Sequence, residues 1–285
     1  MTAALPPDAI AAPLRPFLKW AGGKTRLLPR ILPYVPESFE NYHEPFLGGG
    51  AMFWAIRERI NGTAHLHDLN EILISVWQRV QQDPSGLHQA LAWYMERDSK
   101  EFYYEQRTAA PETLLGQAAR FIYLNQTAWN GLWRVNKHGI FNVPWGDRPF
   151  RGIDEDTLHR LSDALIGASI TTNDFRDTLA KPQAGDFVYL DPPYLPISDT
   201  SKFYLYTEKR FRAPDLVGLA DLCHDLTDRG VHWLMSNRDT EQVRDLFPNN
   251  HIVRFTTRRS VAAQNRRDVE ALDSPEALIV GGPVT

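Results

Sequence analysis

The sequence predicts an α/β fold in which a doubly wound, mostly parallel sheet is covered by helices and carries an inserted helical domain. Short apolar runs alternate with helical patterns, several of these runs end in glycine or aspartate, and a long segment before Ile166 breaks the alternation. With 285 residues, of which 43% are hydrophobic, the chain is long enough to bury a full core.

The apolar runs give the order of the elements. A strand over 42–46 meets a glycine turn at 48–50 and a helix over 51–60, and a strand over 64–66 ends at Asp68 before a helix over 69–80. A buried strand over 187–190 stops at Pro192, because proline cannot continue a ladder. A helix over 216–226, a strand over 231–235, a short helix over 241–247 and strands over 251–255 and 277–280 complete the sheet. Ligands are expected at the carboxyl ends of such strands.

The segment between the second strand unit and Ile166 has a different character. It has a helical pattern from about 84 to 123 and is rich in Trp, Asn and Gly from 124 to 145. We therefore assign residues 76–151 to an inserted domain, residues 17–75 and 152–285 to the domain that contains the sheet, and residues 1–16 to a flexible tail. The tail lacks the features of a signal peptide, and no apolar run approaches the roughly 20 residues of a membrane span. The sequence predicts a soluble, cytoplasmic protein.

The charge and the cysteine content restrict the possible partners and sites. The net charge of −4 is unlike the strongly basic balance of many nucleic-acid-binding domains. The basic residues are unevenly placed, however, and two clusters can form a local positive groove: Arg258, Arg259, Arg266 and Arg267, and Lys209, Arg210 and Arg212. The single cysteine, Cys223, excludes an intramolecular disulfide and argues against a Cys-rich zinc site.

The glycine turn after the first strand suits the close approach of a ligand. Phe46, Gly48 and Gly50 stand between a strand and a helix N-terminus, where the backbone can contact a bound molecule. The turn does not match a dinucleotide fingerprint, since Phe53 occupies the place of its third small residue. Asp68, at the end of the next strand, is placed to bind ribose hydroxyls. Together these residues indicate a ligand that contains a nucleoside.

Two other motifs are weaker. Gly22-Gly23-Lys24-Thr25 ends like a phosphate-binding P-loop, but Leu18 stands where the first glycine is required and no strand precedes it, so a nucleotide triphosphatase is disfavoured. His65 and His67 alternate on one strand face without a third ligand nearby, and we predict no metal site there.

The most specific local motif is Asp191-Pro192-Pro193-Tyr194 at the end of a buried strand. The Asp191 carboxylate and the Pro192 carbonyl can accept both hydrogens of an aromatic amine and localise its lone pair, with a geometry that the prolines make rigid. Tyr194 can stack on the base, a contact that contributes about 1 to 3 kcal/mol. The alternative is an ordinary turn, since Asp and Pro are common turn residues.

Three motifs, in this order, resemble the Dam-type DNA adenine methyltransferases of the α group and D12 class. They are Phe17-Leu18-Lys19-Trp20-Ala21-Gly22-Gly23-Lys24, Glu44-Pro45-Phe46-Leu47-Gly48-Gly49-Gly50 and Asp191-Pro192-Pro193-Tyr194. The resemblance runs from about Phe17 to the C-terminus and implies a Rossmann-like class I methyltransferase sheet. It implies S-adenosyl-L-methionine as the cofactor, bound by Trp20, Lys24, Asp68 and Asp191, and a catalytic role for Asp191, Pro192, Pro193 and Tyr194.

The inserted domain resembles the target-recognition domain of that family, which ends in a β-hairpin. The matching stretches run over 129–134 and 141–146. The resemblance implies that Lys19 and Arg134 contact guanines and that Leu132 and Pro144 lie against a thymine methyl group, which favours GATC as the site. Trp129 and Asn130 would support the strand left behind after base flipping, and Arg258 and Arg259 would contact phosphates. The alternative is a surface hairpin turned at Asn130-Gly131, which two exposed tryptophans in this stretch make unattractive.

We therefore expect an enzyme that methylates N6 of adenine in double-stranded DNA after rotating the base out of the helix, with no metal. We expect a monomer without an obligate protein partner, associated with the nucleoid through DNA. Two alternatives remain open: a methyltransferase of RNA or of a protein amide, whose relatives favour Asn where Asp191 stands, and a DNA-binding regulator without catalysis.

Overall fold

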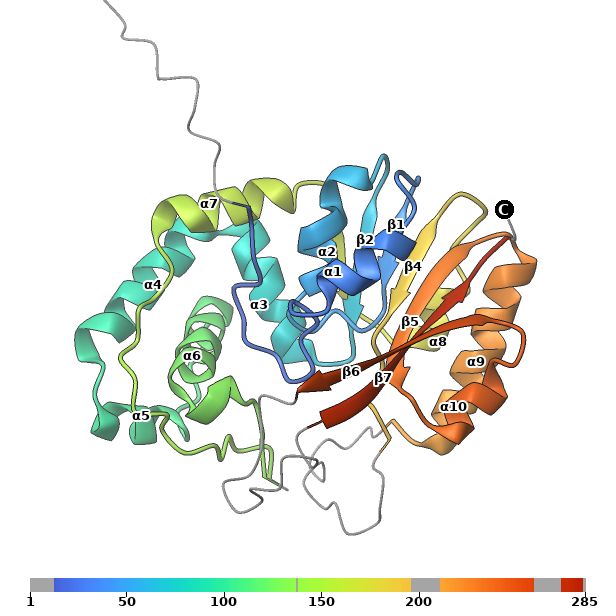
Figure 1. Ribbon diagram of the computed structural model, residues 1–285. Coiled ribbons are helices and arrows are strands. Elements are labelled where there is room, and N and C mark those ends of the chain that lie inside the picture. The colour runs from blue at the N-terminus through green and yellow to red at the C-terminus, as the bar shows by residue number, and fades with distance from the viewer. Residues whose placement is uncertain (1–12, 137, 196–210, 259–272, 284–285) are drawn as a thin grey trace, which may run out of the picture.

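The computed structural model describes residues 13–136, 138–195, 211–258 and 273–283, in which a seven-stranded sheet forms the centre (Figure 1). The strand order is β3-β2-β1-β4-β5-β7-β6; β7 is antiparallel to both its neighbours, and the first five strands of the order are parallel. The predicted α/β fold with a mostly parallel sheet is confirmed. The strands are β1 (Tyr42–Glu44), β2 (Ala64–Asp68), β3 (Ser169–Thr172), β4 (Phe187–Leu190), β5 (His232–Arg238), β6 (His251–Arg258) and β7 (Asp273–Gly281).

The direction of strand addition reverses between β1 and β4. The chain builds outward from β1 to β2 and β3, and then returns to place β4 on the other side of β1. At such a switch point the loops after the two central strands diverge and leave a crevice at the carboxyl ends. The glycine turn follows β1 and Asp191 follows β4, so the fold brings these two motifs to one edge of the sheet.

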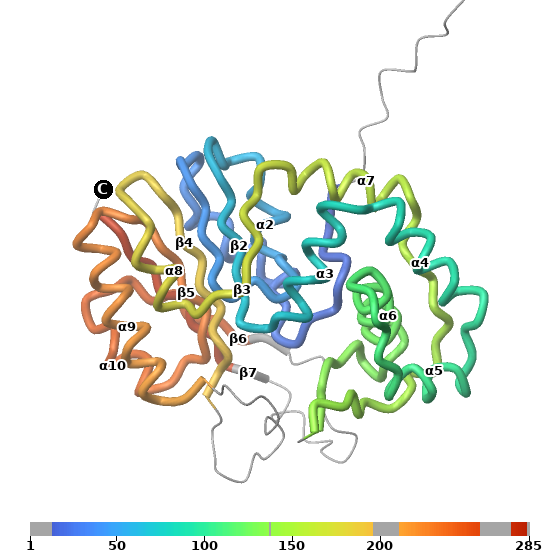
Figure 2. Tube along the Cα trace, turned by 180° about the vertical axis from the view of Figure 1, so that it is seen from behind, coloured from blue at the N-terminus to red at the C-terminus, as the bar shows by residue number. Residues whose placement is uncertain are grey.

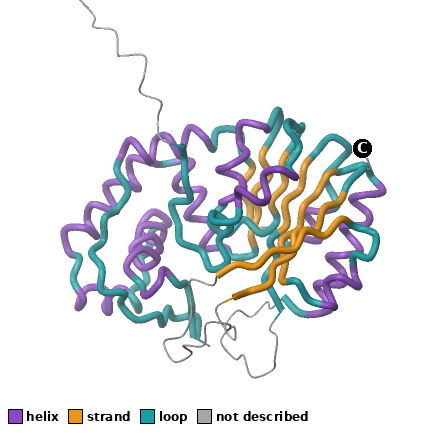
Figure 3. Tube along the Cα trace, viewed as in Figure 1, coloured by secondary structure: helices purple, strands orange, loops and turns teal. Residues whose placement is uncertain are grey.

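Helices cover both faces of the sheet (Figure 3). The α-helices are α1 (Leu28–Ile31), α2 (Ala51–Ile56), α3 (Glu71–Gln82), α4 (Pro84–Arg97), α5 (Lys100–Gln106), α6 (Leu114–Thr127), α7 (Glu155–Ala164), α8 (Phe175–Leu179), α9 (Ala213–Asp228) and α10 (Glu241–Leu246). The described residues also contain the short 3₁₀ helices η1 (Leu32–Tyr34), η2 (Arg57–Arg59) and η3 (Trp129–Gly131).

The alternation of side chains along β4 divides the core in two. Phe187 and Tyr189 join a core with α1, α2 and the helices of the insertion. Val188 and Leu190 point to the other face and join a core with α8, α9 and α10. These three helices are seen from behind in Figure 2. Because both faces are covered, all four residues of β4 are buried, as is typical of a central parallel strand.

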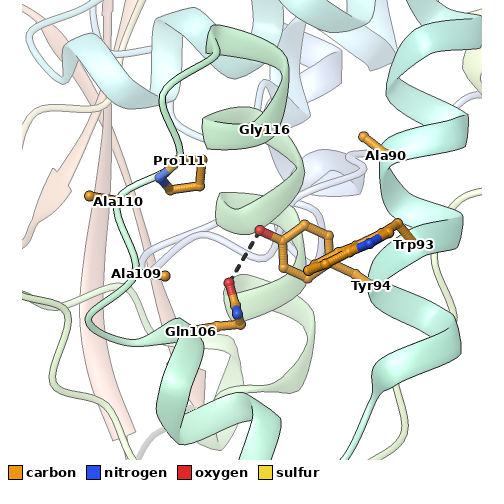
Figure 4. Close-up of a pocket in the computed structure, with 8 residues that line it drawn as sticks. All are labelled: Ala90, Trp93, Tyr94, Gln106, Ala109, Ala110, Pro111 and Gly116. Carbon is orange, nitrogen blue, oxygen red and sulfur yellow. Dashed lines mark hydrogen bonds between the residues drawn. The ribbon is translucent and has the colours of Figure 1, made fainter.

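The insertion is built around α6, which packs against α3 and α4 beside the sheet (Figure 1). An apolar groove of about 400 Å³ opens between α4, α5 and α6, and the Tyr94 hydroxyl donates a 3.3 Å hydrogen bond to Gln106 Oε1 on its wall (Figure 4). The predicted domain boundary at residue 76 falls within α3, and the division into domains remains a prediction. No helix in the described parts of the chain has the length and apolarity to cross a bilayer.

Most predicted elements are present, and the differences have physical causes. The strand over 187–190 is confirmed, whereas the helix over 51–60 is wrong in its last turn: α2 ends at Ile56, and Ile60 is extended because it pairs with Phe39. The sequence did not predict β3, whose one buried residue, Ile170, gives no apolar run. Nor did it predict α7 or α8.

A stack of histidines crosses β1 and β2 and makes stability depend on pH. His43 and His65 are register partners with ring centroids 4.6 Å apart, and His65 and His67 are 6.4 Å apart. Burial lowers the pKa of His43 to about 4, although Asp186 Oδ2 lies 3.2 Å from its Nε2, and burial also lowers the pKa of His67 to about 4. No group of three metal-ligating side chains forms within the described ranges.

Acid is therefore expected to destabilise the fold through His43 and His67. Both are neutral in the folded protein, so their contribution is present above pH 6.5, the unfolded value, and is lost as the pH falls toward 4. Each shift corresponds to about 3 kcal/mol. Urea unfolding between pH 7 and 4 measures this loss, and His67→Gln should flatten the pH profile. His159→Gln, at an exposed position, should leave the profile as it is; a profile that His67→Gln leaves equally steep would contradict this account.

Candidate functional site

The glycine turn after β1 is held in a conformation that only glycine adopts readily. Gly48 and Gly50 have φ values of 48° and 65°. The Gly48 amide donates to Asp68 Oδ2 at 3.0 Å, and the buried Trp77 indole donates to the Gly48 carbonyl at 3.1 Å. A Cβ on Gly50 would lie 2.5 Å from Trp77 Cη2. The turn is thus a rigid backbone surface with no side chain of its own at these two positions.

Asp68 faces this turn from the end of β2. One of its oxygens accepts from Gly48 and the other accepts from the Asn70 amide at 3.0 Å. Burial raises the pKa of Asp68, while the hydrogen bonds from Asn70 and Gly48 lower it. Each carboxylate oxygen has a second lone pair, so Asp68 can still accept hydrogen bonds from a ligand's hydroxyls.

Trp20 and Phe46, both predicted to contact the cofactor, lie on different sides of the turn. The rings of Trp20 and Phe121 are stacked, with their centroids 6.2 Å apart. Trp20 Cδ1 lies 2.6 Å from the position that a Cβ on Gly48 would occupy. The Phe46 ring packs instead against Phe175, 5.5 Å away, in the core below α8. Trp20 therefore borders the glycine surface, and the role of both residues remains a prediction.

Lys24 and Asp191 form an ion pair across 167 positions of sequence, in which Lys24 is buried and Asp191 is partly exposed. Lys24 Nζ lies 2.6 Å and 2.7 Å from the two Asp191 oxygens and donates a third bond of 2.8 Å to the Gly22 carbonyl. Lys24 is 5% exposed. Its three donors are engaged by protein oxygens, and no strand precedes Gly22 among residues 13–21, so the segment does not have the form of a P-loop.

The electrostatics of Asp191 combine two opposing effects. Burial raises the pKa of its carboxyl group, and the Lys24 ammonium lowers it through charge and hydrogen bonding, with burial the stronger. Lys24 thus favours the ionised form, in which both oxygens are acceptors only. Two of the roughly four lone-pair positions of the carboxylate are used by Lys24, which leaves room for a further donor.

Tyr194 ends the motif beside this ion pair. Its ring centroid lies 5.0 Å from Lys24 Nζ, and its hydroxyl donates to Glu276 Oε2 at 2.7 Å. Pro192 is buried and Pro193 is exposed. The structure therefore brings the turn, Asp68, the ion pair and the tyrosine to one edge of the sheet. Glu276 was not predicted from the sequence, because a single acid just before the strand predicted over 277–280 carries no pattern.

A buried asparagine joins the N-terminal motif to the insertion. Asn125, fully buried at the end of α6, accepts from the Lys19 amide at 2.9 Å and donates to the Lys19 carbonyl at 2.7 Å. Gly131, with φ of 64°, packs on the Lys19 side chain, where a Cβ would lie 2.5 Å from Lys19 Cδ. Asn125 was not predicted either, since its role depends on a contact over 106 positions.

The hairpin of the insertion is short and differs in detail from the prediction. Val135 pairs with Phe141 and Ala128 with Trp145, but the turn at Asn130-Gly131 lies at the end of α6 rather than at the hairpin tip. Trp129 is 40% exposed, whereas Trp133 packs on Phe121 with ring centroids 3.8 Å apart and Trp145 is partly buried. The prediction of two exposed tryptophans is therefore wrong, because Trp133 completes the core of the insertion.

The predicted DNA contacts of Lys19 and the insertion nevertheless lie close together. Lys19 touches Gly131, and the Trp129 amide donates to the Pro144 carbonyl at 2.9 Å. Asn130 and Pro144 are exposed, and Leu132 is partly so. Arg134 is oriented by Asn142, whose side-chain oxygen accepts from Arg134 Nε at 2.7 Å.

A cationic cavity adjoins Lys19. It has a volume of about 240 Å³, and Lys19, Arg148 and Arg151 are among its lining residues. Burial lowers the pKa of Lys19, and the charge of Arg148 lowers it further. Local positive charge thus exists despite the net charge of −4. Arg258 ends β6, whereas Arg259, Arg266, Arg267, Lys209 and Arg210 lie outside the described residues.

Comparison with known proteins points to one family. The model of the D12 class N6 adenine-specific DNA methyltransferases matches residues 20–261. The type II methyltransferase M1.LlaDCHI of Lactococcus lactis subsp. cremoris is 34% identical over 261 residues, which cover 88% of this chain and 91% of that protein. The type II methyltransferase M.MjaIII of Methanocaldococcus jannaschii is 36% identical over 243 residues, with coverage of 79% and 84%. The DNA adenine methylase of Escherichia coli (strain K12) is 32% identical over 267 residues, with coverage of 90% and 94%.

Proposed function

Because the chain belongs to the D12 class of N6 adenine-specific DNA methyltransferases, we propose that it methylates adenine N6 in duplex GATC sites with S-adenosyl-L-methionine as donor. The observation that carries this proposal is the Asp191-Pro192-Pro193-Tyr194 loop, which leaves β4 beside the glycine surface. Two rigid acceptors and an aromatic ring there suit a flat base that bears an amine.

The residues at the switch point fit S-adenosyl-L-methionine. The surface of Gly48 and Gly50 has a positive φ at both positions and excludes a Cβ, Trp20 borders it, and the acceptor Asp68 faces it. We assign cofactor binding to these residues together with Phe46, Lys24 and Asp191. When bound, the cofactor supplies a methyl group that its sulfonium already activates, so the protein's task is to position the amine and exclude water.

Asp191 and Pro192 hold the amine in this proposal. The target adenine rotates out of the duplex, because its N6 cannot be reached while it is stacked. The Asp191 carboxylate and the Pro192 carbonyl accept the two amino hydrogens, Pro193 keeps the loop rigid, and Tyr194 stacks on the ring. Lys24 favours the ionised form of the Asp191 carboxylate. No metal is required by this arrangement.

The insertion, residues 76–151, reads the DNA in this proposal, and residues 17–75 and 152–285 carry out the transfer. Lys19 and Arg134 bind guanine edges, Leu132 and Pro144 contact the thymine methyl group, and Trp129 and Asn130 support the strand that the flipped base leaves. Arg148 and Arg151 beside Lys19, with Arg258 and Arg259, contact phosphates. Double-stranded DNA is the only partner required, and the protein acts as a monomer on the DNA of the nucleoid.

Methyl transfer to synthetic duplexes tests the proposal directly. Purified protein and tritiated S-adenosyl-L-methionine should label a duplex with one GATC site, and should not label a duplex with GTAC or one with both GATC adenines already methylated at N6. Digestion of the product should yield labelled N6-methyl-2′-deoxyadenosine. Labelling of RNA or protein in place of the duplex would assign the chain to another substrate, and binding to GATC without labelling would indicate a regulator.

A further inference from the structure

A cross-strand pair behind Tyr194 is not accounted for by the proposed function. Arg238 ends β5, and Glu276 on β7 is its direct partner in the antiparallel register. Since β4 and β5 are parallel, the end of β5 lies at the same edge as the loop that follows β4. β7 runs in the opposite direction, so its beginning, with Glu276, reaches that edge too.

Arg238 and Glu276 both contact the loop that follows β4. Glu276 Oε2 accepts from the Tyr194 hydroxyl at 2.7 Å, and Arg238 Nη1 donates to the Leu195 carbonyl at 2.8 Å. Arg238 Cζ also lies 6.0 Å from the centroid of the Tyr194 ring. Each of the two charged side chains is 8% exposed, so these bonds are largely shielded from water. The pair therefore holds the side chain of Tyr194 and the backbone that follows it.

The orientation of the Tyr194 ring requires contacts from outside the loop. Proline fixes φ at residues 192 and 193, but Tyr194 comes after the prolines, and nothing in its own backbone fixes its ring. A stacking side chain contributes fully only when its orientation is locked by a second layer of contacts. The hydroxyl is the atom of Tyr194 farthest from the backbone, so its hydrogen bond to Glu276 restricts the orientation of the ring strongly.

We propose that Glu276 and Arg238 are positioning residues of the methyl-transfer reaction, which fix the Tyr194 ring in the plane that receives the extruded adenine. The inference rests on the proposed function, in which Tyr194 stacks on that base. It adds a requirement that the loop motif alone does not contain: an acid on β7 opposite an arginine on β5.

The experiment compares four variants in steady-state methyl transfer to the GATC duplex. Glu276→Ala should lower kcat about tenfold, the factor that a buried hydrogen bond to a charged group supports, with KM for DNA changed less than about twofold. Glu276→Gln retains an acceptor oxygen and should recover most of that loss. Tyr194→Phe, which removes the hydroxyl alone, should lower kcat as much as Glu276→Ala. The double variant Glu276→Ala/Tyr194→Phe should be no slower than either single variant.

The inference would be overturned if the fold-losses of kcat in the two single variants multiplied in the double variant. An unchanged kcat in Tyr194→Phe would overturn it as well. Tyr194→Phe keeps the test valid even if Glu276→Ala fails to fold. Asp239→Asn is the matched control: it breaks a neighbouring ion pair, with Arg244 Nη1 2.6 Å from Asp239 Oδ1, and should leave kcat unchanged. A wild-type protein that labels no duplex would refute the proposed function, whereas an active wild type with multiplicative variants refutes this inference alone.

Discussion

Asp191→Ala should lower the rate of methyl transfer by about a thousandfold or more while leaving DNA affinity within about threefold of the wild type. The variant removes the acceptor that orients the amine, and the loss of a preorganised polar group at the reacting centre has an effect of this order. Most of the side chains that we assign to DNA lie on the insertion, and no hydrogen bond links the Lys19 or Arg134 side chain to Asp191 in the described part of the chain. Single-turnover transfer and fluorescence anisotropy with the same duplex measure the two quantities. A parallel loss of affinity and rate would contradict this separation of roles.

The ion pair requires a second control for this variant. Asp191→Ala leaves Lys24 buried beside the Gly22 carbonyl alone, and breaking a buried pair destabilises a protein by about 3 to 5 kcal/mol. The double variant Asp191→Ala/Lys24→Met removes the uncompensated charge and should recover part of the free energy of unfolding. It should remain inactive, because it still lacks the Asp191 carboxylate and also lacks Lys24, which we assign to the cofactor.

Gly50→Ala should destabilise the protein by about 2 to 5 kcal/mol. A left-handed backbone disfavours a residue other than glycine by roughly 1 to 2 kcal/mol, and overpacking adds about 1 to 3 kcal/mol. The new Cβ would lie 2.5 Å from Cη2 of Trp77, a fully buried ring that also bonds to Gly48 and cannot move away freely. Urea denaturation measures the change in the free energy of unfolding.

Gly218→Ala is the matched control for this substitution. Gly218 lies within α9 and has no atom within 4 Å of the position of a new Cβ. Alanine favours a helix by roughly 0.5 to 1 kcal/mol over glycine, so this variant should be as stable as the wild type or more stable. Equal stability of Gly50→Ala and wild type would show that the turn tolerates a side chain.

The elements that were predicted correctly carry a local signal in the sequence. The strand over 187–190 is a continuous apolar run closed by proline, and its bounds are those of β4. The glycine turn at 48–50 was predicted between a strand and a helix, and the structure has β1 before it and α2 after it. The alternation of such strands with helices predicts a mostly parallel sheet, because parallel sheets are usually covered by helices on both faces.

Features that depend on contacts between distant segments of the chain were not predicted. Asn125 and Glu276 are single polar residues in elements that the sequence describes by their apolar neighbours, and their partners lie 106 and 82 positions away. The exposure of the tryptophans was misjudged for the same reason, since Trp133 is covered by Phe121 of another element. β3 escaped notice because an edge strand with one buried residue has no period to detect.

The short stretch from Lys19 to Lys24 has a consequence for how two ligands communicate. Within six positions it contacts Gly131 at the end of α6 through Lys19, borders the glycine turn through Trp20 and pairs with Asp191 through Lys24. In the proposed function, DNA contacts Lys19 and the cofactor contacts Trp20 and Lys24, so both ligands bind one stretch of six residues. Coupling through this stretch would be reciprocal, so that each ligand would change the affinity for the other by the same factor.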